Sequence, residues 1–247
     1  MGKLLKFESR KLFRQKSLYI CSLIFAAWSS LTVVISYLVS KMMHAEASCQ
    51  SAQDAMVGAI GAGMFSTIAA IVVALIVCKD FQWKTVRNVL TKGYTRNQFY
   101  LAKLIISEIA VLCMLILSWI VSFITGLILY GTGYTPENMV YALVAQIFVA
   151  SAFAALFNML SFLVRSTGGS IAVGIIVPMV AGTIVDLIDV AAKLSFKFSD
   201  LLLSSKVNVV YKGSASTGDI TKALITALCY IAITAFIGMI VNKKREV

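Results

Sequence analysis

Three acids within or at the edge of long apolar runs are the first candidates for chemistry in this chain. Glu108 lies near the start of one run, and Asp186 and Asp189 lie three residues apart at the end of another. Because a charge in hydrocarbon is costly, such residues normally face a protein interior or water, and they often mark an ion path. Glu108 is expected either to pair with Lys103 or Arg165 or to act in transport. The aspartates either are solvated at the interface or bind a cationic solute.

Two further features inside apolar runs are of mechanical interest. Asn158 can hydrogen-bond to a neighbouring helix, a packing role, or can contact a substrate. Pro178 removes a backbone hydrogen bond in mid-helix, and Gly174 and Gly182 lie four residues to either side. This spacing predicts a kink, which either gates a pathway or is static and improves packing.

No pattern for enzymatic chemistry accompanies these residues. The sequence contains no GxxxxGK[ST] phosphate-binding loop, no HExxH and no GxSxG, and its one histidine is His44. The five cysteines are scattered singly, without a CxxC pair. We therefore expect no catalytic residue, no metal site and no cofactor on this chain, and no hydrolysis of ATP by the chain alone.

A basic polar segment, residues 78–103, separates two apolar runs. Asp80 is its one acid, against six basic residues: Lys79, Lys84, Arg87, Lys92, Arg96 and Lys103. Its apolar residues recur at helical spacing before Gly93 breaks the pattern. A short basic helix is expected here, and such a helix at a membrane surface can dock a partner.

Composition defines the class of protein. The chain is 60% hydrophobic and 13% charged, with a mean hydropathy of +0.89, which is far too apolar for a soluble domain. Its net charge of +11 comes from basic residues at the ends of apolar runs, where they set topology and meet anionic lipid. We expect an integral membrane protein in contact with lipid, and no binding of nucleic acid.

The apolar runs predict an all-α polytopic protein of one domain, residues 1–247. Six runs are long enough to cross a bilayer, which takes about 20 residues at about 1.5 Å each. Ahead of them, residues 1–16 form an amphipathic pattern typical of an interfacial helix. The expected spans are residues 18–39, 55–77, 104–130, 139–164, 170–188 and 223–241.

The distribution of positive charge predicts the orientation. Sixteen of the 22 Lys and Arg residues fall on one side of the expected spans. The positive-inside rule then places both termini and residues 78–103 in the cytoplasm. Residues 189–221 form the longest outer segment, which is expected either to pair as short strands or to lie as an interfacial helix.

The arrangement resembles the type-2 ABC exporter permeases. The likeness covers nearly the whole chain: a basic amphipathic amino-terminal helix with Glu8 and Lys11, six spans with both ends inside, and a basic loop between spans 2 and 3. Lys84 stands where that family usually has Gly. The loop positions that resemble the family pattern are Asp80, Thr85, Arg87, Gly93, Arg96 and Lys103.

This resemblance implies a coupling role for residues 78–103. The segment would insert into a groove on a separate ATPase subunit, which would bind ATP and Mg. Two ATPases would assemble with two permease copies, or with this permease and a related one, in a bacterial cell membrane. The expected apolar anchors are Phe81, Trp83, Val86 and Leu90, and the residues expected to steer docking are Lys84, Arg87 and Arg96.

The resemblance also implies a class of transported substrate. Small permeases of this length are similar to those of bacteriocin and lantibiotic immunity and of drug efflux, which implies export of an amphipathic peptide, such as an antimicrobial peptide, or of a hydrophobic drug. Two other classes stay open from the residues alone. One is a small ATP-independent cation channel or carrier that uses Glu108, Asp186 and Asp189. The other is a membrane scaffold or sensor subunit that transports nothing.

Overall fold

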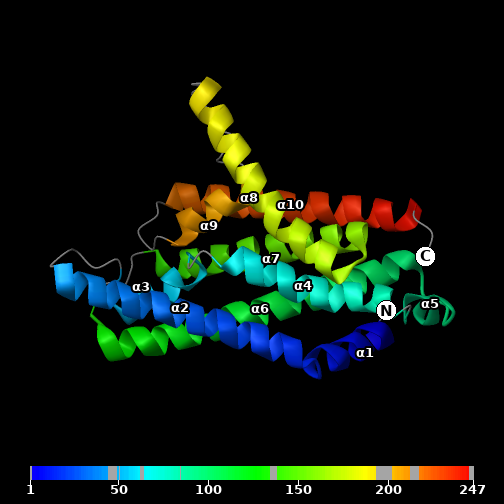
Figure 1. The fold of residues 1–247 in the computed structure, drawn as a ribbon, viewed down its shortest axis with the longest axis horizontal. Helices are drawn as coiled ribbons and strands as arrows, with labels where there is room; N and C mark the ends of the chain where they lie inside the picture. The colour runs from blue at the N-terminus through cyan, green and yellow to red at the C-terminus, as the bar shows by residue number, and fades with distance from the viewer. Residues whose placement is uncertain are drawn as a thin grey trace.

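Six long apolar helices make this chain a multi-pass membrane protein (Figure 1). They are α2 (Lys16–Met43), α4 (Phe65–Gln82), α6 (Arg96–Leu129), α7 (Met139–Val164), α8 (Thr167–Ala192) and α10 (Thr217–Lys244). The computed structural model describes residues 2–43, 49, 51–61, 64–83, 85–133, 138–192, 202–211 and 217–244, and within these ranges it contains no strand. The predictions of an all-α chain and of six spans are confirmed. Lys84, His44 and the side chains of Leu90 and Asp186 lie outside the described part.

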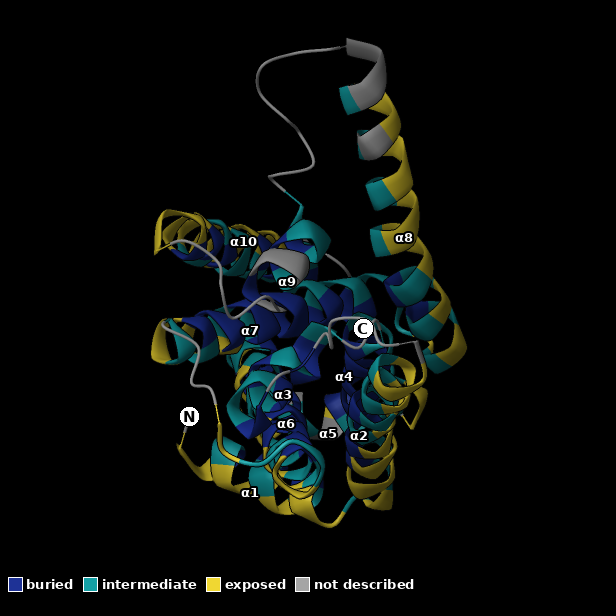
Figure 2. Cartoon of the chain, turned by 90° about the vertical axis from the view of Figure 1, so that its left-hand side faces the viewer, coloured by how far each residue is buried: buried dark blue, intermediate teal, exposed yellow. Residues whose placement is uncertain are grey.

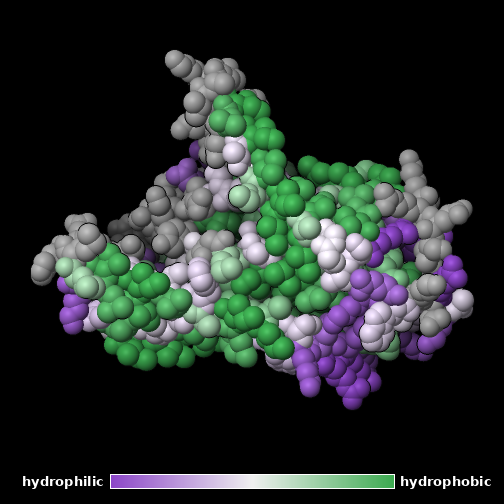
Figure 3. Space-filling model, viewed as in Figure 1, coloured by the Kyte–Doolittle hydropathy of each residue, from purple (hydrophilic) through white to green (hydrophobic). Residues whose placement is uncertain are grey.

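The centre of the bundle is formed by α4 and α7, which are the most buried of the six, with α6 beside them. This centre combines small residues with edge-to-face aromatic pairs: Phe65 of α4 packs on Phe153 of α7 and on Phe25 of α2. The outer faces of α2, α6 and α10 carry exposed Ile, Leu and Phe side chains, and Figure 3 shows hydrophobic surface along the spans. Apolar surface of this extent is typical of contact with lipid or with another membrane subunit.

The second span begins later than predicted. Residues 55–61 belong to a short helix, α3 (Ala52–Gly58), and a 3₁₀ turn, η1 (Ala59–Gly61), and the spanning helix starts only at Phe65. Ser51 caps α3 by accepting a hydrogen bond from the Asp54 amide at 3.2 Å. Buried helix breaks need partners for the freed backbone groups. Gln146 supplies one, because its Nε2 donates to the Val57 carbonyl at 2.7 Å.

The outer part of α8 stands apart from the other helices. Near its start, α8 packs closely on α4, where a Cβ added to Gly174 would lie 2.9 Å from the Ala70 Cβ. Farther along, Met179 and Leu187 are exposed, and Figures 1 and 2 show this half leaving the bundle. The predicted kink residue, Pro178, lies inside a continuous helix just beyond the packed part.

The segment predicted as residues 189–221 is shorter than expected. Its ends belong to α8 and α10, and its described middle is a helix, α9 (Leu203–Tyr211), which packs on α7. Of the two forms left open by the sequence, the helix is therefore correct for these residues. Leu203 and Val210 are buried, so α9 packs into the bundle on α7 and does not lie only on its surface.

Two helical glycines give a stability test of the packing. A Cβ at Gly238 of α10 would overlap the hydroxyl of Tyr100, which is fully buried, whereas a Cβ at Gly182 of α8 meets nothing within 4 Å. Gly238→Ala should destabilise by about 1–3 kcal/mol through overpacking. Gly182→Ala should be neutral or stabilise by up to about 1 kcal/mol, because Ala is the better helix former. Thermal unfolding of the purified variants in one detergent measures both, and equal midpoints would contradict the packing of α10 on α6.

Candidate functional site

The amino-terminal helix, α1 (Gly2–Phe13), carries an acid on its buried face. Leu4, Glu8 and Leu12 follow one another at four-residue spacing, and all three are buried where α1 packs on α6. Phe7 is exposed on another side of the helix. An amphipathic helix is thus present over Gly2–Phe13, shorter than the predicted residues 1–16 because Lys16 already belongs to α2, and it presents a carboxylate to the bundle.

The basic segment is shorter than the predicted 78–103. Residues up to Gln82 belong to α4, and residues from Arg96 belong to α6, so only 83–95 connect the two spans. This connection contains the predicted short helix, α5 (Thr85–Leu90), and a turn at Gly93 with φ +85°. Thr95 then starts α6 through a capping box with Gln98.

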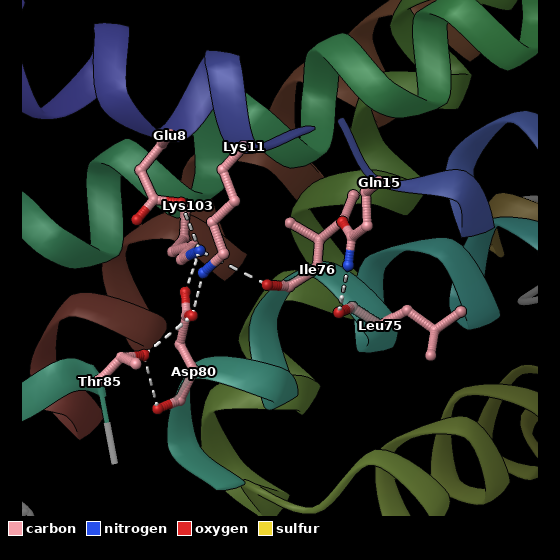
Figure 4. A network of polar contacts seen from close by, with 8 residues as sticks. All are labelled: Glu8, Lys11, Gln15, Leu75, Ile76, Asp80, Thr85 and Lys103. Carbon is pink, nitrogen blue, oxygen red and sulfur yellow. Dashed lines mark hydrogen bonds and ion pairs between the residues drawn. The ribbon is translucent and has the colours of Figure 1, made fainter. Parts of the chain in front are cut away.

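Four charged side chains from three helices meet beside the start of α5 (Figure 4). Lys103 of α6 lies 2.6 Å from Glu8 of α1 and also forms an ion pair with Asp80 of α4. Lys11 of α1 forms a second ion pair with Asp80. The Thr85 hydroxyl donates to the same carboxylate at 3.0 Å and so attaches the first residue of α5 to the cluster. We call Glu8, Lys11, Asp80 and Lys103 the ion cluster.

Three of the four side chains in the ion cluster are buried, so their charges must neutralise one another. The side chains of Lys103, Glu8 and Asp80 are only 1%, 3% and 5% exposed, whereas Lys11 is 38% exposed. Two acids and two bases neutralise one another, and Lys103 has a further acceptor in the Ile76 carbonyl at 3.5 Å. Ions taken from water are tolerated only when paired and hydrogen-bonded in this way. The ion cluster therefore joins α1, α4, α5 and α6 as one unit.

Several residues expected to dock a partner instead hold the fold together. Asp80 and Thr85 belong to the interior contacts just described. Phe81 packs edge-to-face on Phe99 and Phe162, and the Arg165 guanidinium lies 5.3 Å from the centre of its ring. Phe81 is partly buried, and these contacts leave less of its ring for a partner, so its predicted role as an apolar anchor loses support.

The docking residues left at the surface are few. Trp83 is 77% exposed and Arg87 is also exposed, whereas Val86 is buried. Arg96 is only partly exposed, and its carbonyl accepts a hydrogen bond from Asn242 of α10 at 2.8 Å. That contact also brings the end of α10 to the end of the bundle that carries α1 and α5, as Figure 1 shows.

The other predicted polar residues are dispersed. Glu108 was expected to pair with Lys103 or Arg165, but Lys103 turns to the ion cluster and Arg165 to Phe81, while Glu108 faces Ser151 of α7. Asn158 is fully buried in the same helix. The Glu8 contact was missed as a site, although its four-residue spacing from Leu4 and Leu12 could have placed it on the buried face.

Comparison with known families gives one match. Residues 17–247 match the family described as "Protein of unknown function (DUF2705)". The matched region contains Asp80 and Lys103 of the ion cluster and begins after α1. No curated protein matches the chain.

Removal of the central cation tests the ion cluster. Lys103→Met leaves Glu8 uncompensated in the interior, so we expect a loss of about 3–5 kcal/mol. The double variant Glu8→Gln/Lys103→Met should recover much of this loss, since Asp80 keeps Lys11. Lys222→Met, which breaks an exposed pair with Asp219, should cost less than about 1 kcal/mol. Unfolding midpoints of the three variants measure these losses. A double variant no more stable than Lys103→Met would refute the buried pair, because the two substitutions would then act independently.

Proposed function

We propose that the chain, which belongs to the DUF2705 family, is the membrane-spanning permease subunit of an ATP-driven exporter of the type-2 ABC class. In this proposal α1, α5 and both termini lie in the cytoplasm of a bacterial cell. Separate ATPase subunits bind ATP and Mg, two for each assembly, and a second permease copy or a related permease completes the pore.

The attachment of α5 to the ion cluster is the observation that carries this proposal. A docking helix can transmit force only if it is fixed to the spans it has to move. Thr85 attaches α5 to Asp80 of α4, and Asp80 in turn pairs with Lys103 of α6 and Lys11 of α1. Displacement of α5 would therefore move three helices together.

The exposed side of the connection has the chemistry of a docking surface. Trp83 is a large aromatic side chain with 77% exposure, the type of residue that most often anchors an interface. Arg87 and Lys92, both exposed, add positive charge that would steer an acidic partner surface. We assign the docking role to these residues, and we reassign Asp80, Phe81 and Thr85 to the transmission of movement.

The cargo that fits best is an amphipathic peptide or a hydrophobic drug that enters from the bilayer. Apolar side chains line the surface of α2 and the outer half of α8, including Trp28 and Met179. The alternative of a cation channel or carrier has weaker support. Its main acid, Glu108, faces the hydroxyl of Ser151 and lies apart from the ion cluster.

Two substitutions on the connection test the docking surface. Trp83→Ala with Arg87→Glu should release a co-expressed ATPase subunit encoded beside this chain, because both side chains are exposed and their loss leaves the fold intact. Trp28→Ala with Lys222→Glu is the matched control and should retain the ATPase. Co-purification in detergent measures the outcome, and retention by the first variant would refute docking at α5.

Pro178 tests whether α8 moves during transport. Pro178→Ala restores a backbone hydrogen bond where α8 leaves the bundle, next to the exposed Met179. We expect ATP-driven export to fall several-fold while the amount of membrane-inserted protein stays the same. Export of labelled peptide from cells, normalised to protein in the membrane, makes the comparison. A proportional loss of both quantities would assign Pro178 to folding.

A further inference from the structure

A groove separates α1 from the connection that contains α5. It has a volume of about 720 Å³ and is lined by both elements and by the end of α4. A second hollow of about 370 Å³ adjoins it and shares Phe7, Thr85 and Val89 as lining residues. Phe7, Val89 and Trp83 provide apolar surface in the larger groove.

The rim of this groove carries excess positive charge. Its two acids, Glu8 and Asp80, are already neutralised within the ion cluster. The remaining charged residues of the larger groove, Arg10, Arg14 and Lys79, are all basic. The smaller hollow adds two more basic residues, Lys3 and Lys92. A ligand for this site must therefore combine an anionic group with an apolar part.

The groove lies where the membrane surface begins. Only two residues separate α1 from the start of the span α2 at Lys16, and within its first two turns Tyr19, Ile20 and Leu23 are all exposed. Figure 3 shows hydrophilic surface over this end of the molecule directly beside the hydrophobic surface of the spans. Lipid headgroups occupy this level, and Trp, Lys and Arg are typical of it.

We propose that the groove binds one anionic phospholipid. The lipid phosphate would be held by Arg10, Arg14 and Lys79, and an acyl chain would lie against Phe7 and Val89. Charge complementarity and continuity with the lipid-facing surface of α2 favour a lipid over a peptide partner. Because the groove is bounded by α1 and by the α5 connection, a bound lipid would fix α5 relative to the spans. This inference goes beyond the proposed function and does not require an ATPase.

The test uses the full chain in nanodiscs, without any partner. In discs of phosphatidylcholine, replacement of part of the lipid by phosphatidylglycerol should raise the unfolding midpoint, since a ligand of the folded state stabilises it. Native mass spectrometry should show one phosphatidylglycerol retained. Arg14→Gln/Lys79→Gln should abolish both effects. Lys41→Gln/Lys222→Gln removes two exposed charges elsewhere and should preserve them.

Each other outcome would overturn the proposal. An equal midpoint in the two lipids would show that the headgroup charge is not recognised. The same stabilisation by inorganic phosphate in phosphatidylcholine discs would indicate a site for a free anion. Loss of the effect in the control variant would indicate general attraction to the surface. Retention of the lipid by Arg14→Gln/Lys79→Gln would show that these residues do not hold it, and in a separate co-purification in detergent, loss of the ATPase by this variant would assign the groove to a protein interface. Phe7→Ala, exposed and outside the ion cluster, should weaken lipid retention without loss of folding.

Discussion

The need to neutralise Lys103 determines how one end of this protein is built. Lys103 follows Arg96 by two turns of α6 and is almost completely buried, so its ammonium group cannot reach water. Desolvation of an ion costs several kcal/mol even after relaxation, and only well-placed partners offset it. Glu8 and Asp80 are those partners, and Lys11 balances the charge that Asp80 adds. Charge balance, in addition to the burial of apolar surface, therefore determines that α1 packs on α6 and that α4 lies beside them.

A second constraint acts at the other end, where backbone groups must be satisfied within the bilayer. The chain between α2 and α4 is broken into α3 and η1, and such irregular backbone is tolerated at membrane depth only inside protein. Gln146 answers this need by donating to Val57, while its own carbonyl oxygen accepts a hydrogen bond from Trp119 at 2.7 Å. Gly126 of α6 lets α3 approach, since a Cβ there would lie 2.8 Å from the Ala55 Cβ. The hydrogen bonds of Gln146 and the close approach allowed by Gly126 therefore accommodate the break in the helix before α4.

Features that depend on local composition can be predicted from the sequence. The side of a helix on which a residue lies, and the distant residue that it contacts, cannot. Six spans follow from length and hydropathy, and α7 begins and ends at the predicted residues, 139 and 164. The predicted start of the second span is too early because residues 55–64 carry no charge and so continue the apolar run of α4 in the sequence. Phe81 and Thr85 were assigned to docking because their types suit an exposed helix as well as an interior contact. The partners of Lys103 come from residues 8 and 80, and no local pattern relates such distant positions.

The contrast between the two parts of the bundle has a mechanical consequence for the proposed exporter. The ion cluster and Thr85 make α1, α4, α5 and α6 one unit, whereas the outer half of α8 extends away from the other helices (Figure 2). Helix α4 belongs to that unit and also packs closely on α8, through Ala70 and Gly174. A displacement of α5 would reach α4 at Asp80 and would pass to α8 through Cys78, whose Sγ lies 3.0 Å from the Ser170 Oγ, and through Ala70, ten residues before Asp80. Because α8 packs on α4 near its start and leaves the bundle beyond Pro178, a small shift at these contacts would be enlarged at its outer end.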